Sequence, residues 1–156
     1  MINNIEAYLT YENIYLIANF GVLPFWFMLL VIPNHSLTKI FAQSIMAPLL
    51  LALAYVFVGY KIYLEGNIFE GFDLYFGLEN LYSVYSEESL LLVFWLHFLS
   101  ISLFVGAWIA RDSQKYFIPR IITFISLILT YFTGPVGLVF YWFFRIFFSR
   151  KIGFND

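Results

Sequence analysis

Few side chains in this sequence can do chemistry, and one of them lies inside a long apolar segment. His97 is near the middle of residues 89–110, a run that contains no Asp, Glu, Lys or Arg. An imidazole can transfer protons as a general acid or base, and ionisable groups within membrane segments are functional candidates by default. We therefore predict that His97 is a catalytic residue. The alternative is a structural imidazole that bridges two helices through a hydrogen bond to Asn19 or Thr133.

Aromatic side chains are the second unusual feature, because Phe, Tyr and Trp make up 23% of the residues. Rings near the ends of a membrane segment form interfacial belts, but several rings here fall deeper. Flat rings beside glycines can form a slot for a long conjugated molecule, whose burial is favourable in proportion to its apolar contact. The alternative is that these rings are simply bulky side chains that face the lipid. The predicted substrate-binding residues, polar helpers included, are Asn19, Trp26, Trp95, Ser102, Trp108 and Gly134.

Charged residues at the expected membrane boundaries form a third group. Glu79, Arg111 and Asp112 are predicted as structural or interfacial polar residues. A charged cluster of this kind is most often a solvated helix end. In the functional alternative, Arg120 or Lys115 holds Asp112, which then fixes the start of the next helix or contacts a polar head group.

The composition excludes several classes of function. The chain has no Cys, which excludes disulfides, thiolate nucleophiles, iron–sulfur clusters and Cys-based zinc sites. The two His, only one of which lies in an apolar run, cannot form a bis-His haem site within one chain. A net charge of -2 without a basic patch argues against nucleic acid as a partner. We predict neither a metal site nor a cofactor.

The elements that must position these residues are membrane helices. The chain is 62% apolar and 12% charged, and four runs lack charged residues altogether: 13–38, 40–60, 89–110 and 121–144. Each is long enough to cross a bilayer, which takes roughly 20 apolar residues. The predicted fold is all-α, an integral membrane bundle of four transmembrane helices in one domain over residues 1–156. The expected spans are 15–32, 44–63, 89–110 and 121–147.

Two of these spans are expected to be kinked. Pro24 interrupts the first, and Gly134-Pro135-Val136-Gly137 interrupts the fourth, which we predict to be a single helix bent or unwound at that point. Residues 64–88 form the one long connection. They contain six acidic residues and no basic ones, together with aromatic residues at three- and four-residue spacing. This segment is either a solvated loop or a helix lying in the membrane interface.

Several stretches of the sequence resemble a known family. They are NFGVLPFWFMLLVIPNHSLT (19–38), LENLYSVYSEESLLLVFWLHF (78–98), LFVGAWIARDSQKYFIPR (103–120) and GPVGLVFYWFFR (134–145). They resemble the abscisic-acid-deficient-type membrane proteins, the family of the plant protein required for neoxanthin synthesis, and indicate a bacterial-type or divergent member. The resemblance implies a four-span membrane protein.

Two positions depart from the family pattern. The pattern has an Asp before the Leu-Phe-Val-Gly run and an Arg before the Trp, where this chain has Ser102 and Ala107. If those charged groups belong to the plant protein's chemistry, this chain uses other groups or does something else.

The resemblance implies that the protein binds a hydrophobic isoprenoid and takes part in carotenoid or apocarotenoid metabolism, of the xanthophyll type, as a cofactor-free isomerase. The alternatives are a non-catalytic carotenoid-binding or assembly protein and a small transporter, since interrupted helices can line substrate sites. The expected partners are membrane lipid, a carotenoid-like small molecule and further copies of the chain. The expected location is a bacterial inner membrane or a plastid-type membrane, crossed several times.

Overall fold

The computed structural model describes residues 9–66 and 70–150, and over these residues it contains helices and no strands. The predicted all-α class is therefore confirmed for the described part of the chain. The α-helices are α2 (Tyr11–Val31), α3 (Met46–Glu65), α4 (Leu78–Ser86), α5 (Glu88–Lys115), α6 (Arg120–Thr133) and α7 (Pro135–Ser149). A π-helix, η1 (Thr38–Ala42), and a 3-10 helix, η2 (Glu70–Phe76), complete the set.

Three helical segments among the described residues are long and apolar enough to cross a membrane. They are Tyr11–Val31, Thr38–Glu65 and Glu88–Lys115, and they indicate a membrane protein. They correspond to the first three predicted spans, with shifted ends. The second segment begins at Thr38 rather than at residue 44, because η1 precedes α3. Helix α5 continues through Lys115 because no helix-breaking residue lies between Ala110 and Lys115.

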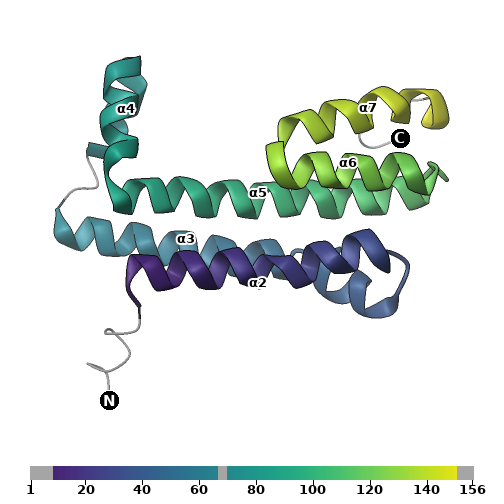
Figure 1. Cartoon of the computed structure of the whole chain (residues 1–156), viewed down its shortest axis with the longest axis horizontal. Coiled ribbons are helices and arrows are strands. Elements are labelled where there is room, and N and C mark those ends of the chain that lie inside the picture. Colours follow the sequence, from purple (N-terminus) through teal and green to yellow (C-terminus); the bar gives the residue numbers. More distant parts are fainter. Residues whose placement is uncertain (1–8, 67–69, 151–156) are drawn as a thin grey trace. The chain divides into compact units, whose positions relative to one another are not determined.

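The prediction of one bent helix over 121–147 is wrong. Helix α6 ends at Thr133, and α7 begins at Pro135 and turns back beside α6 (Figure 1). The break does lie at the predicted Gly-Pro sequence: Gly134 has φ 61° and ψ −88°, and proline has no N–H with which to continue a helix. With 14 and 15 residues, α6 and α7 are each about 21–23 Å long, shorter than the roughly 30 Å hydrocarbon core.

Glycine allows α6 and α7 to approach closely. A Cβ added to Gly137 would overlap the Thr130 side chain and lie 2.6 Å from the carbonyl oxygen of Ser126. Both neighbours are completely buried, and the Thr130 hydroxyl donates a hydrogen bond to that same oxygen at 2.8 Å. The hairpin is therefore packed backbone to backbone at this point.

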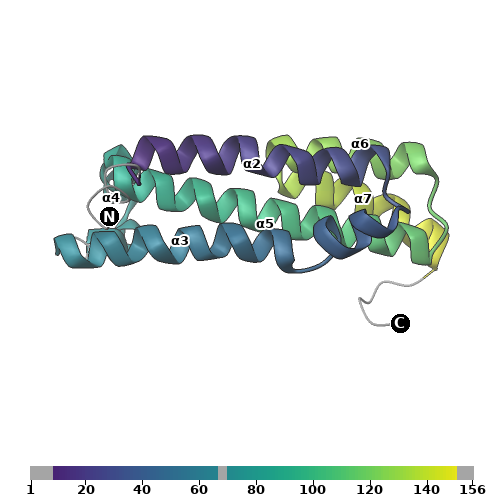
Figure 2. The same ribbon diagram turned by 90° about the horizontal axis from the view of Figure 1, so that it is seen from below.

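The described helices divide between two compact units. Unit 1 comprises Met1–Gly21 and Leu49–Ser100, and unit 2 comprises Val22–Pro48 and Ile101–Asp156. In unit 1, the first part of α2, most of α3 and the first part of α5 run side by side (Figure 2). Completely or almost completely buried side chains there include Val58, Ile62 and Leu96.

Unit 2 holds the α6–α7 hairpin with the second parts of α2 and α5. Its fully or almost fully buried apolar side chains are Val22, Leu29, Leu103, Ile109, Leu127 and Tyr141. Helix α2 passes through Pro24 without ending, so proline is accommodated inside an unbroken helix. The kink predicted there stays a prediction.

The acidic connection 64–88 is mostly helical where it is described. Helix α4 follows η2 and is set across the direction of the first part of α5, which belongs to the same unit (Figure 1). Leu78 and Tyr82 are 81% and 78% exposed on α4, so the segment presents apolar surface. These features favour the interfacial helix over the solvated loop. Phe69 of the predicted aromatic pattern lies outside the described residues.

Candidate functional site

His97 lies at the wall of the larger of two cavities described here in unit 1. This cavity has a volume of about 570 Å³ and is bounded by residues of α3, η2, α4 and α5. The imidazole faces the ring of Tyr55, with 6.2 Å between ring centroids. The aromatic residues of the lining are Tyr55, Phe72, Tyr75, Tyr85 and Phe94. A mainly apolar concavity of this size, with a polar group at its wall, is typical of small-molecule sites.

The imidazole of His97 is exposed and makes no hydrogen bond to the described part of the chain. Its two predicted bridging partners are engaged elsewhere. Asn19 accepts a hydrogen bond from Trp95 at 3.0 Å, and Thr133 donates to the carbonyl of Leu129 at 2.7 Å. The ring nitrogens of His97 are therefore available to a molecule in the cavity.

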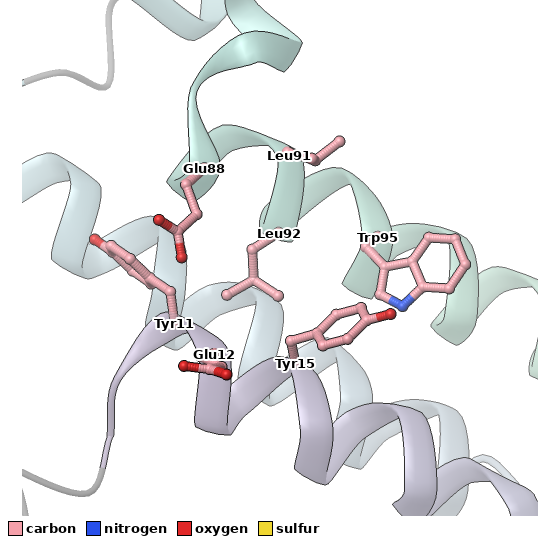
Figure 3. Close-up of a pocket in the computed structure, with 7 residues that line it drawn as sticks. All are labelled: Tyr11, Glu12, Tyr15, Glu88, Leu91, Leu92 and Trp95. Atoms are coloured by element: carbon pink, nitrogen blue, oxygen red, sulfur yellow. The ribbon is translucent and has the colours of Figure 1, made fainter.

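A smaller cavity in unit 1, of about 380 Å³, is bounded by the start of α2 and by α5. Figure 3 shows the rings of Tyr15 and Trp95 close together on one side of it, and the carboxylates of Glu12 and Glu88 on the side of Tyr11. The Tyr15 and Trp95 ring centroids are 6.3 Å apart. Of the predicted substrate-binding residues, Trp95 lines this cavity. Its indole N–H donates to the amide oxygen of Asn19, which is not a lining residue.

The structure does not bring Trp95 and His97 into one cavity. A separation of two residues along an α-helix corresponds to a rotation of about 200°. The side chains of Trp95 and His97 therefore leave α5 on nearly opposite faces. Trp95 lines the smaller cavity and His97 the larger one.

The predicted site residues Trp26 and Ser102 belong to the interior of unit 2. Trp26 is buried, and a Cβ on Gly106 would lie 2.7 Å from the tip of its indole ring. The indole also meets the ring of Tyr131 edge-on, with 5.3 Å between centroids. Ser102 is 4% exposed. Trp26 and Ser102 therefore pack within the protein and line neither cavity of unit 1.

Unit 2 contains a buried ion pair that the sequence analysis did not predict. Arg145 donates from Nε to Oδ2 of Asp112 at 2.6 Å and from Nη2 to Oδ1 at 3.2 Å. The hydroxyl of Tyr141 donates to the same Oδ2 at 2.7 Å. Arg145 is 0% exposed and Asp112 is 7% exposed. A buried carboxylate is stable only when its oxygens accept such hydrogen bonds, which this arrangement supplies.

Aromatic rings surround the Arg145 guanidinium. Its central carbon lies 4.9 Å from the ring centroids of Tyr116 and Trp142 and 5.9 Å from that of Trp108. These are cation–π distances. Trp108, predicted as a substrate-binding residue, thus contacts Arg145 and also meets the Tyr141 ring edge-on.

The predicted partners of Asp112 were wrong. Arg120 donates to the carbonyl of Val31 at 2.6 Å, while Asp112 is held by Arg145 and Tyr141. Asp112 lies within α5 and is not a solvated helix end. One signal in the sequence pointed to its partners: Tyr141 and Arg145 are four residues apart in an apolar helical segment, so they share a helix face.

The remaining predicted site residues take no part in this ion pair. Gly134 forms the turn between α6 and α7, and Glu79 and Arg111 are exposed on α4 and α5. The described residues contain no group of three or more His, Cys, Asp or Glu that could hold a metal ion.

Residues 13–141 match the profile of the ABA4-like family, described as ABA DEFICIENT 4-like. The chain belongs to the ABA4-like family. This confirms the resemblance carried by its sequence motifs. Comparisons with curated proteins and with solved structures gave no match.

The two departures of this ABA4-like chain from the expected family pattern lie in the interior. Ser102 and Ala107 are 4% and 2% exposed, so an Asp and an Arg at these positions would have to be buried. Among the described residues, the buried acidic and basic side chains are Asp112 and Arg145. Arg145 lies beyond the residues matched by the family profile.

Proposed function

We propose that this ABA4-like protein binds one end of a carotenoid-like isoprenoid in the cavity beside His97 and takes part in carotenoid metabolism. Membership of the ABA4-like family supports the metabolic role. The single observation that carries the assignment of the site is the placement of the His97 imidazole at the wall of a 570 Å³ cavity rich in aromatic rings. We further propose that the protein acts in a bacterial inner membrane or a plastid-type membrane.

The chemistry of the cavity lining suits a polyene. Tyr55, Phe94 and Tyr85 present flat rings, which make large apolar contacts at low cost in conformational entropy. Several lining residues are also partly open to the surroundings; Tyr75, for example, is 77% exposed. One end group of the isoprenoid can therefore occupy the cavity while its polyene chain remains in the hydrocarbon of the bilayer.

The catalytic form of the proposal is an isomerisation, such as the rearrangement of an epoxide. The imidazolium of His97 gives a proton to the epoxide oxygen as one carbon–oxygen bond breaks. The neutral imidazole then takes a proton from a neighbouring carbon as a double bond forms. All atoms of the substrate are retained, so the step needs no oxidant or reductant.

A second candidate is pigment binding without chemistry, and one observation favours it. A general base is usually oriented by a third group through a hydrogen bond, whereas His97 has only a ring contact, with Tyr55, among the described residues. A bound pigment could then be presented to other proteins unchanged.

The experiment compares wild type with His97→Ala and His97→Gln in a carotenoid-producing host. Pigments are extracted from membranes and from the purified protein and identified by chromatography and absorption. Ile101→Ala is the control, because this exposed α5 residue lines none of the described cavities. Loss of conversion in both His97 variants, with protein level and bound pigment retained, would support catalysis.

Two other results are informative. Bound pigment that all variants leave unaltered would favour the binding protein over the isomerase. Purified wild-type protein without pigment, from a host whose pigment profile does not respond to the protein, would contradict both forms of the proposal.

A further inference from the structure

We infer that a cavity at the end of helix α2, within unit 2, binds a phosphate-bearing anion through polar side chains of its lining. The anion is the head group of an anionic membrane lipid or free phosphate. The cavity has a volume of about 750 Å³ and lies between the segment after α2 and the segment that joins α5 to α6. The lining residues that matter here are Asn34, His35, Gln114, Phe117 and Arg120. The inference does not depend on the proposed function in unit 1.

Several backbone acceptors at this cavity are already satisfied. Arg120 donates to the carbonyl oxygen of Val31 at 2.6 Å. Gln43 and Gln114 both donate to the carbonyl of Pro33, at 2.6 and 3.2 Å. Side chains thus cap the carbonyl end of α2, whose partial negative charge would otherwise repel an anion.

His35 and Arg120 are the donors best placed for an anion. The backbone N–H of Leu37 donates to Nδ1 of His35 at 3.2 Å, so Nε2 is the nitrogen that carries the proton and can donate. Arg120 has five N–H groups, and its one hydrogen bond among the described residues uses only one of them. In the described part of the chain, the one ion pair is that of Asp112 with Arg145, so Arg120 has no carboxylate there.

The charge of unit 2 favours the same ligand. Among its described residues, Asp112 is the sole acidic side chain, and Arg145 already neutralises it. The remaining charged side chains are all cationic: Lys39, Arg111, Lys115, Arg120 and Arg150. An excess of Lys and Arg at a membrane boundary attracts anionic lipids.

The position of the cavity brings the phosphate groups of membrane lipids within reach of its lining. It adjoins the ends of two candidate membrane helices, at Val31 and Lys115, where lipid phosphates are found. Phe117, at the same cavity, is 89% exposed and has φ 53°, a conformation that non-glycine residues rarely adopt. Its ring is held outward from the protein, where it can rest among lipid chains.

The test uses the full chain, purified in detergent. Phosphatidylglycerol, phosphatidylcholine and inorganic phosphate are each added, and bound species are counted by native mass spectrometry across a concentration series. Arg120→Gln and His35→Ala remove the proposed donors. Arg111→Gln is the matched control, because it removes the same charge from an exposed position that does not line the cavity.

We expect phosphatidylglycerol to bind in preference to phosphatidylcholine, and Arg120→Gln to weaken its binding roughly tenfold or more, the effect of losing one charge-assisted hydrogen bond. Arg111→Gln should leave it unchanged. Arg120-dependent binding of inorganic phosphate, with no preference between the lipids, would support the anion site and identify free phosphate as its source.

Equal loss in the Arg120 and Arg111 variants, or no Arg120-dependent binding of any of these probes, would overturn the inference. Because Arg120 also caps α2, its replacement could unfold the protein. His35→Ala then decides the question, since it removes a donor without removing that cap: weaker phosphatidylglycerol or phosphate binding supports the site, and undiminished binding overturns it.

Discussion

The guanidinium of Arg145 holds the carboxylate of Asp112 through two hydrogen bonds, at 2.6 and 3.2 Å, and both side chains are buried. Removing one partner leaves the other as an unpaired buried charge, which costs roughly 3–5 kcal/mol in other proteins. We therefore expect Asp112→Leu and Arg145→Met each to lower the free energy of unfolding by about 3 kcal/mol. Denaturant unfolding in detergent micelles measures this.

The control for these variants is Arg111→Gln, which removes an exposed charge next to Asp112 and should change stability by less than about 0.5 kcal/mol. The double variant Asp112→Leu/Arg145→Met should be much more stable than the sum of the single losses predicts, because no charge is left unpaired. Strictly additive losses would mean that the two residues act independently.

Tyr141 contributes a separate hydrogen bond to the same carboxylate. Its hydroxyl donates to Oδ2 of Asp112 at 2.7 Å, while its ring meets Trp108 edge-on. Tyr141→Phe keeps the ring and removes the donor, so we expect a loss of about 2 kcal/mol in the free energy of unfolding. The same change in the Asp112→Leu background should cost far less, and an equal cost in both backgrounds would refute the role of the hydrogen bond.

The long spans and the ion pair differ in how far they could be predicted from sequence. Runs without charged residues predicted α2, α3 and α5. A helix that crosses a bilayer needs roughly 20 consecutive apolar residues, and such a run can be read directly from the sequence. The pairing of Asp112 with Arg145 spans 33 positions in the chain. It depends on the direction that the chain takes after α6, which no local pattern specifies.

The turn at Gly134 illustrates that limit. The Gly-Pro sequence predicted correctly that the helix is interrupted, but interruption allows either a bend or a reversal. The positive φ of Gly134 and the close contact of Gly137 with Thr130 and Ser126 accompany the reversal. By contrast, the placement of Trp95 and His97 in different cavities could be predicted from their two-residue spacing on one helix.

The close approach at Gly137 gives a third prediction. Gly137→Ala places a methyl group against the Thr130 side chain and 2.6 Å from the Ser126 carbonyl oxygen. Overpacking of this kind typically costs 1–3 kcal/mol, so we expect a loss of about 2 kcal/mol in the free energy of unfolding. Gly21→Ala is the matched control: its Cβ meets no atom within 4 Å, and alanine favours helix by roughly 0.5–1 kcal/mol. A stability gain in both variants would contradict the packing of the hairpin.

The cavity beside His97 offers a fourth prediction, because one of its lining residues is a glycine with open space around it. Gly59 of α3 lines it, and a Cβ at this position meets no atom within 4 Å. We expect Gly59→Phe to occupy the cavity and abolish pigment binding, while the free energy of unfolding changes by less than about 1 kcal/mol. Gly21→Phe is the control, because it adds the same ring to a helix at an open position outside the cavity.

Pigment stoichiometry of the purified proteins, determined by absorption, separates the two variants. Loss in the Gly59 variant alone locates the pigment in this cavity whether or not His97 performs chemistry, because the substitution leaves the imidazole in place. If Gly59→Phe keeps its full complement of pigment, the pigment lies elsewhere in the protein, and His97 cannot act on it from the wall of this cavity.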